Sequence, residues 1–112
     1  MSLVLSKEEI DSILSNAPME KSFRFQTAEG QDTKVTAFSL EDFSEKLLQI
    51  DVASIDFHYP RGDFQTWTRD VVKDNELADR LCYIKKEDSG EKLRKDVLKI
   101  VQKRILELKT SV

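Results

Sequence analysis

The sequence predicts an α+β domain in which an N-terminal β-hairpin packs against four to five helices, the last of them long. Two observations carry this prediction. Apolar and polar residues alternate through residues 22–38, which is the period of β-strands. In several later segments, and longest in residues 93–108, apolar residues recur every three or four positions, as on the buried face of a helix. With 112 residues and no internal repeat, we expect a single α+β domain over residues 21–112, preceded by a helix and short linker in residues 1–20.

Composition narrows the class of protein. Charged residues make up 35% of the chain, yet the net charge is only −3, which is typical of helices with paired charges and disfavours nucleic acid as the main partner. The single cysteine, Cys82, cannot form an internal disulfide, as is usual in a reducing cytosol. No apolar run is long enough for a bilayer and no signal peptide is evident, so we expect a cytoplasmic protein without membrane contact.

The first expected element is a short amphipathic helix. Ser6 stands three residues before Glu9, the spacing of a capping box in which each side chain accepts a backbone N–H of the helix start. Pro18 lies just beyond the expected end of this helix. Its apolar face consists of Ile10, Ile13 and Leu14. Because so short a helix is marginal alone, it needs a surface to lie on.

The hairpin comes next. Residues 22–27 and 34–38 alternate in polarity, and residues 29–32 between them have turn chemistry with Gly30. A lone hairpin is unstable in water. We therefore expect helices to cover its face of Phe23, Phe25 and Val35.

Four helices are expected between residues 39 and 84. Ser39 is a good N-cap for the first, whose inner stripe is Leu40, Phe43, Leu47 and Ile50. Residues 53–59 fit either a strand or a helical turn ended by Pro60, and we favour a short helix there. Asp63 is expected to cap a helix over residues 64–72, and Asp74 another that carries Leu77 and Leu81.

The last helix is expected to begin at a second capping box made by Asp88 and Glu91. Its apolar stripe is Leu93, Val97, Ile100, Val101, Ile105 and Leu108. It also has a basic excess, in Lys92, Arg94, Lys95, Lys99, Lys103, Arg104 and Lys109. A solvated face explains this excess better than an acidic partner or nucleic acid, and a homodimer through the exposed parts of the helix is an alternative.

One cluster could carry chemistry: His58, Arg61 and Asp63, with Trp67 close behind. A histidine oriented by a carboxylate is a general base, and an arginine beside it could hold an anionic ligand. No nucleophile is placed near His58, however, so we assign no catalytic residue. We favour a structural joint between two helices, and keep a ligand pocket at His58, Arg61, Asp63 and Trp67 as the alternative.

Metal binding is not expected. One His and one Cys cannot form a closed zinc site. Asp70, Asp74 and Glu76 lack the alternating-oxygen loop of calcium sites. We expect no metal and no cofactor.

Two resemblances add to these inferences. Four motifs resemble a family of short prokaryotic proteins, frequent in archaea, that is defined as a domain of unknown function: Ser39-Leu40-Glu41-Asp42-Phe43 leading into Leu47; Ser54-Ile55-x-Phe57-His58; Arg61-Gly62-Asp63-Phe64-x-x-Trp67; and Asp74-x-Glu76-Leu77-Ala78. This resemblance spans residues 23–108 and implies a mostly helical domain, with no activity, substrate or cofactor attached.

The second resemblance covers residues 5–14, which are similar to the N-terminal peptide of flagellar motor switch proteins that captures the activated chemotaxis response regulator. It implies an amphipathic helix that docks in a groove of a response regulator, with exposed anchors at Ile10, Ile13 and Leu14. Ser12 stands where a smaller Ala is usual. Taken together, the sequence predicts a non-enzymatic protein-interaction module that contacts its partner through this helix or the His58–Trp67 surface.

Overall fold

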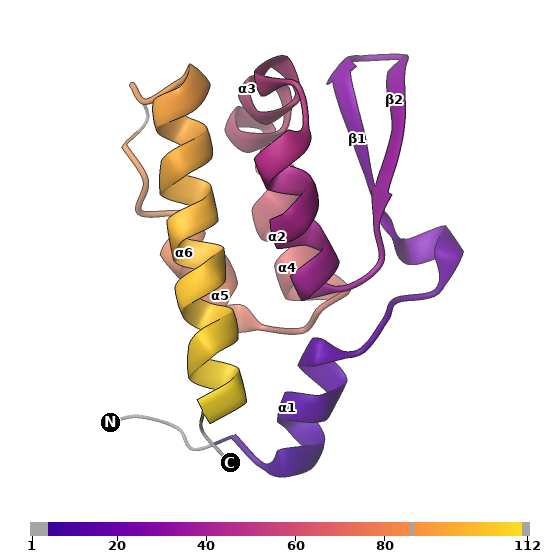
Figure 1. Ribbon diagram of the computed structural model, residues 1–112, viewed down its shortest axis with the longest axis vertical. Coiled ribbons are helices and arrows are strands. Elements are labelled where there is room, and N and C mark those ends of the chain that lie inside the picture. The colour runs from indigo at the N-terminus through magenta and orange to yellow at the C-terminus, as the bar shows by residue number, and fades with distance from the viewer. Residues whose placement is uncertain (1–4, 86, 111–112) are drawn as a thin grey trace.

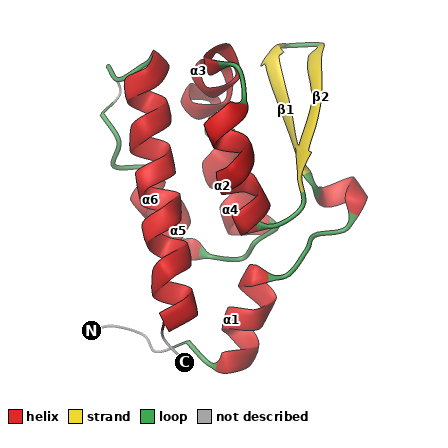
Figure 2. Ribbon diagram, viewed as in Figure 1, coloured by secondary structure: helices red, strands yellow, loops and turns green. Residues whose placement is uncertain are grey.

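The computed structural model describes residues 5–85 and 87–110. Its elements in chain order are α1 (Lys7–Leu14), a 3-10 helix η1 (Met19–Lys21), β1 (Phe23–Ala28), β2 (Gln31–Ala37), α2 (Leu40–Gln49), α3 (Val52–Arg61), α4 (Asp63–Asp70), α5 (Asn75–Leu81) and α6 (Gly90–Thr110). One hairpin stands beside a group of helices that ends in the long α6 (Figures 1 and 2). The predicted α+β class is confirmed.

The hairpin is antiparallel, and its register is irregular on the side near the turn. Phe23 pairs with Ala37 and Phe25 with Val35, but beyond Phe25 the register shifts. Lys34 has a left-handed φ of 65° beside this irregularity. β1 lies between β2 and α3 (Figure 1), so α3 covers the edge of β1 that β2 leaves open. A covered edge protects the two-stranded sheet from pairing with another chain.

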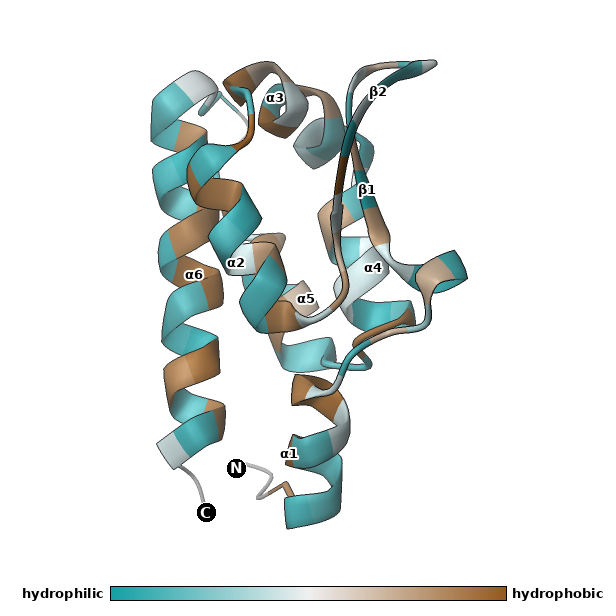
Figure 3. Ribbon diagram, turned by 45° about the vertical axis from the view of Figure 1, so that its right-hand side comes forward, coloured by the Kyte–Doolittle hydropathy of each residue, from teal (hydrophilic) through white to brown (hydrophobic). Residues whose placement is uncertain are grey.

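The core is built around an aromatic group contributed by the hairpin and by helices α2 and α4. The Phe23 ring lies 5.5 Å from Phe43, 5.3 Å from Phe64 and 5.7 Å from Trp67, measured between ring centroids. Hydrophobic and hydrophilic residues alternate along α6 (Figure 3), as expected for an amphipathic helix with one side in the core. None of the helices in residues 5–85 and 87–110 has the length and apolar character needed to cross a membrane.

Two helix starts differ from the expected caps. Asp63 is the first residue of α4 and not its N-cap, because Gly62 in a left-handed conformation occupies the cap position. Asp88 does not cap α6, which begins at Gly90. The Gly90 N–H instead donates to Asp56 Oδ1 of α3 at 2.7 Å, so a carboxylate distant in sequence satisfies this helix end. The expected caps at Ser6, Ser39 and Asp74 are confirmed.

Residues 53–59 are helical as favoured, but α3 continues through Pro60 to Arg61. Proline in the last turn costs one intrahelical hydrogen bond. The chain then reverses at Gly62, which has a φ of 78° and is at once the C-cap of α3 and the N-cap of α4.

We expect Gly62→Ala to lower the free energy of unfolding by about 1–2 kcal/mol, because an L-residue is strained in the left-handed conformation. Nothing lies within 4 Å of where the new Cβ would stand, so the loss comes from the backbone alone. Gly62→Asn is the matched control, and should lose less because asparagine tolerates this conformation. Chemical denaturation of the three proteins measures the difference, and an alanine variant as stable as the wild type would contradict the account.

Candidate functional site

The turn between α3 and α4 brings together three of the predicted ligand-binding residues. His58 Nδ1 donates a hydrogen bond to Asp63 Oδ2 at 2.8 Å, and Arg61 Nε donates to the same oxygen at 3.1 Å. The Arg61 guanidinium also lies 4.5 Å from the centroid of the Phe57 ring, a cation–π contact. The positive charge of Arg61 is thus already paired within the turn.

The other nitrogen of His58 reaches the hairpin. Its Nε2 accepts a hydrogen bond from the backbone N–H of Gln26 at 2.8 Å, at the point where the strand register shifts. An acceptor at Nε2 and a donor at Nδ1 define one neutral tautomer of the ring. The ring is buried, with 4% of its residue surface exposed, and both nitrogens are used within the protein. His58 is therefore built as a structural link and not as a free acid or base.

Burial lowers the pKa of His58, because the charged imidazolium would lose its hydration. The Asp63 carboxylate opposes this effect through its hydrogen bond and charge, and the Arg61 cation adds to it. A proton added at Nε2 would also break the bond from Gln26. The folded protein thus favours neutral His58.

Trp67 lies apart from this trio. Its ring is 7% exposed, and its Nε1 donates to the backbone oxygen of Lys21 at 2.9 Å, which ties η1 to α4. Trp67 and Phe64 both lie in the hydrophobic core.

The N-terminal helix is docked on its own domain. Ile10 is 3% exposed and Ile13 is 5% exposed, and both belong to the hydrophobic core, while Leu14 packs partly buried against it. The expectation that Ile10, Ile13 and Leu14 are exposed anchors is wrong for this conformation. The physical reason is that α2 and α6 together offer the apolar surface that so short a helix needs.

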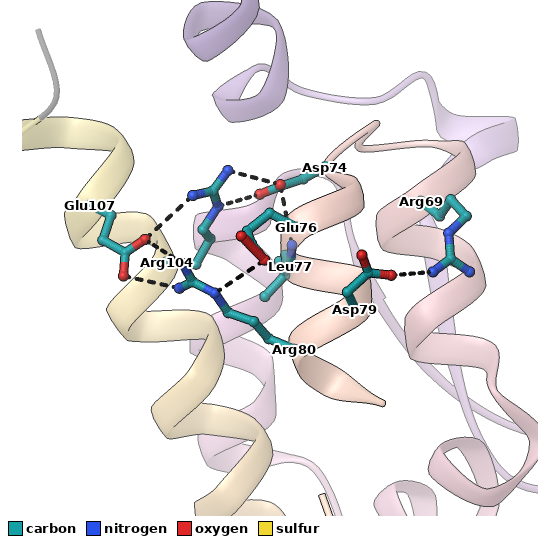
Figure 4. A network of polar contacts seen from close by, with 8 residues as sticks. All are labelled: Arg69, Asp74, Glu76, Leu77, Asp79, Arg80, Arg104 and Glu107. Atoms are coloured by element: carbon teal, nitrogen blue, oxygen red, sulfur yellow. Dashed lines mark hydrogen bonds and ion pairs between the residues drawn. The ribbon is translucent and has the colours of Figure 1, made fainter. Parts of the chain in front are cut away.

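A polar network joins α5 to α6 (Figure 4). Arg104 donates two hydrogen bonds to the buried Asp74, from Nε at 2.8 Å and from Nη2 at 3.0 Å. Glu107 accepts two bonds from Arg80, each at 2.9 Å, and a third from Arg104 at 3.3 Å. The bonds from Arg80 lower the pKa of Glu107. Asp74 also caps Leu77, so one carboxylate fixes the start of α5 and its distance from α6.

On the side of α6 away from the hairpin, the α5–α6 connection runs beside the helix (Figure 1). Between them lies a groove of about 720 Å³, which we call the α5–α6 groove. Its apolar lining consists of Tyr83, Ile84 and Ile100. Among the described residues, five basic side chains line it: Arg80, Lys85, Lys92, Lys99 and Lys103. Its three carboxylates are Asp88, Asp96 and Glu107.

Asp88 and Asp96 form a linked pair in this groove. A hydrogen bond between their carboxyl groups raises the pKa of Asp88 and lowers the pKa of Asp96. Lys92 Nζ lies 3.8 Å from Asp88 and 3.6 Å from Asp96. Both carboxylates of this pair therefore lie near the same cation, Lys92 of α6.

The sequence indicated only some of the residues that line the groove. The basic excess of the last helix includes Lys92, Lys99 and Lys103, which line it, but it also includes Arg104, which is buried on Asp74. Tyr83 and Lys85 come from a connection with no periodic pattern, and no sequence signal marked them.

No protein-family model, curated protein or solved structure matches this chain. Both resemblances noted from the sequence therefore stay predictions.

We expect the wild-type protein to lose stability as the pH falls from 7.5 to 5.5, at most by about 1.4 kcal/mol per pH unit from His58. The pKa of His58 is lowered in the folded state, so below the ordinary value of 6.5 the unfolded chain takes up a proton that the folded protein refuses. Stability from this group is therefore full at neutral pH and declines on acidification. Denaturation at several pH values, compared with His58→Gln, isolates the effect, and equal pH slopes for the two proteins would refute it.

We expect Arg104→Met to lower the free energy of unfolding by about 3–5 kcal/mol, because it leaves the buried Asp74 carboxylate without its cation. The double variant Asp74→Asn/Arg104→Met should be less destabilised than this single one. Arg69→Met is the matched control: it removes the exposed Arg69–Asp79 pair and should cost at most about 1 kcal/mol. Thermal or chemical unfolding ranks the three, and equal losses in the two single variants would contradict the account.

Proposed function

We propose that this protein is a non-enzymatic interaction module that binds another protein through the α5–α6 groove. The observation that carries the proposal is the exposure of Tyr83, whose residue surface is 86% accessible beside the apolar Ile84 and Ile100 of the groove. Exposed tyrosines that stand next to an apolar depression are typical of protein interfaces, where the ring supplies contact area and the hydroxyl stays hydrated.

The internal use of His58 supports a binding role over a catalytic one. It is the only histidine of the chain, and both of its ring nitrogens are engaged in the fold. A general base must reach the proton that it abstracts, and a ring 4% exposed between the hairpin and α4 is poorly placed for this.

The alternative proposal is an anion pocket at His58, Arg61 and Asp63. It requires Asp63 to release both Arg61 and His58, since the carboxylate now neutralises the groups that would attract the anion. Arg61 is half exposed, so the entry of an anion would begin there.

The N-terminal helix offers another route to a partner, a response regulator by resemblance. This route needs Ile10 and Ile13 to leave the core, since both side chains are buried against α2 and α6. A homodimer through α6 would use Leu106, which is 63% exposed. The α5–α6 groove needs no such rearrangement, and we therefore place the contact there.

The proposal predicts that a photo-crosslinker placed at Tyr83 captures a partner in the native host. We would replace Tyr83 by p-benzoylphenylalanine, irradiate the cells and identify adducts by mass spectrometry. The matched control carries the crosslinker at Leu48, another exposed apolar residue, on α2. One adduct specific to Tyr83 and lost on Lys99→Glu supports the groove. Equal adducts at both positions, or none at Tyr83, would refute it.

A further inference from the structure

We infer that the partner of the α5–α6 groove presents an acidic peptide segment with at least one large apolar side chain. The inference rests on the proposed function and adds the chemistry of the partner. It follows from the lysines of the groove that, among the described residues, have no ion pair with a carboxylate, and from the apolar side chains that line the groove. It follows also from the length of the row of basic residues that runs from Lys92 to Lys103 on α6, which we call the basic row.

Each carboxylate of the groove lies beside a cation of the fold. Glu107 accepts hydrogen bonds from Arg80 and Arg104. Asp88 and Asp96 share Lys92, whose Nζ lies 3.8 Å from Asp88 and 3.6 Å from Asp96. The basic residues of the described lining outnumber these carboxylates, so its net charge is positive and attracts an acidic partner.

The cations of the groove are less fully used. Within the part of the chain that the structure describes, Lys85 and Lys103 form no ion pair with a carboxylate. The hydrogen bond from Asp88 and the charge of Lys99 both lower the pKa of Asp96, but Lys99 and Asp96 form no ion pair. Two other basic residues of α6 have partners outside the groove: Arg94 donates to the Leu47 carbonyl at 2.6 Å and Lys109 lies 3.0 Å from Glu41. Lys95 is exposed and does not line the groove. Lys85, Lys99 and Lys103 thus bring three positive charges to one groove, although the whole chain has a net charge of −3. Such a patch attracts and orients an acidic surface.

The apolar lining distinguishes a peptide from a polyanion. Ile84, 8% exposed, and the half-buried Ile100 lie in the groove, and Tyr83 rises beside them. A phosphate backbone would leave these apolar atoms in water and would approach Asp96. A peptide can place acidic side chains on the lysines and an apolar side chain on the isoleucines, which favours a peptide over nucleic acid.

The basic row fits a short segment. Lys92 and Lys103 are three turns apart on α6, or about 16 Å at the rise of an α-helix. An extended chain covers that span with about five residues. A volume of about 720 Å³ lies within the range of ligand-binding clefts, so the groove suits a linear segment and not a whole domain face.

Peptide display tests the inference. A random dodecapeptide library would be selected on the immobilised full chain, with counter-selection on Tyr83→Ala, which should fold because Tyr83 is 86% exposed. We expect the enriched peptides to combine an excess of Asp and Glu with an aromatic or aliphatic residue. Enriched peptides that require Tyr83 but have no acidic excess would overturn the acidic partner and leave the proposed function standing. No Tyr83-dependent enrichment would overturn both, as would stronger Tyr83-dependent binding of a single-stranded oligonucleotide than of any selected peptide.

A double charge-reversal variant then measures the electrostatic contribution to peptide affinity. Lys99→Glu/Lys103→Glu should weaken the best selected peptide by about tenfold or more in fluorescence anisotropy, since each tenfold step corresponds to about 1.4 kcal/mol. Lys7→Glu/Lys95→Glu, with the same change in net charge on exposed residues outside the groove, is the matched control and should change the affinity less than about twofold. Equal losses in the two double variants would overturn the assignment of the acidic segment to this groove.

Discussion

The neutral imidazole of His58 joins the hairpin to the helices, and the remaining packing follows from that link. One ring nitrogen accepts the Gln26 N–H of β1 and the other donates to Asp63 at the start of α4. A two-stranded sheet is not stable alone. The ring also lies against Phe23 and Phe64, so the same residue fixes polar and apolar contacts. Because burial disfavours its charged form, the docking of the sheet depends on one protonation state.

A second polar contact fixes how α5 packs against α6. Asp74 caps α5 and binds Arg104, so the orientation of α6 about its own axis is fixed where it meets α5. With Arg104 turned inward, Lys99 and Lys103 line the α5–α6 groove. The proposed binding surface is thus a consequence of a buried ion pair, because a rotated α6 would present a different row of side chains.

Much of the fold could be predicted from residues close together in sequence. Helical spacing identified the core face of α6, and capping chemistry located Ser6, Ser39 and Asp74. Predictions from neighbouring residues were wrong where a side chain bonds to a partner distant in the sequence. Asp63 bonds to His58 and Arg61 instead of capping α4, and Asp56 caps α6 from thirty-four residues away. The bond from Gln26 to His58 and the groove beside Tyr83 likewise join segments whose meeting no periodicity encodes.

The measurement that tests the central claim most directly is a long-range ¹H–¹⁵N correlation spectrum of the imidazole at neutral pH. His58 is the only histidine, so its two ring nitrogens are assigned without ambiguity. The account predicts a protonated Nδ1 and an unprotonated Nε2, because Nδ1 donates to Asp63 and Nε2 accepts from Gln26. A proton on Nε2, either in the opposite tautomer or in a doubly protonated ring, would contradict it.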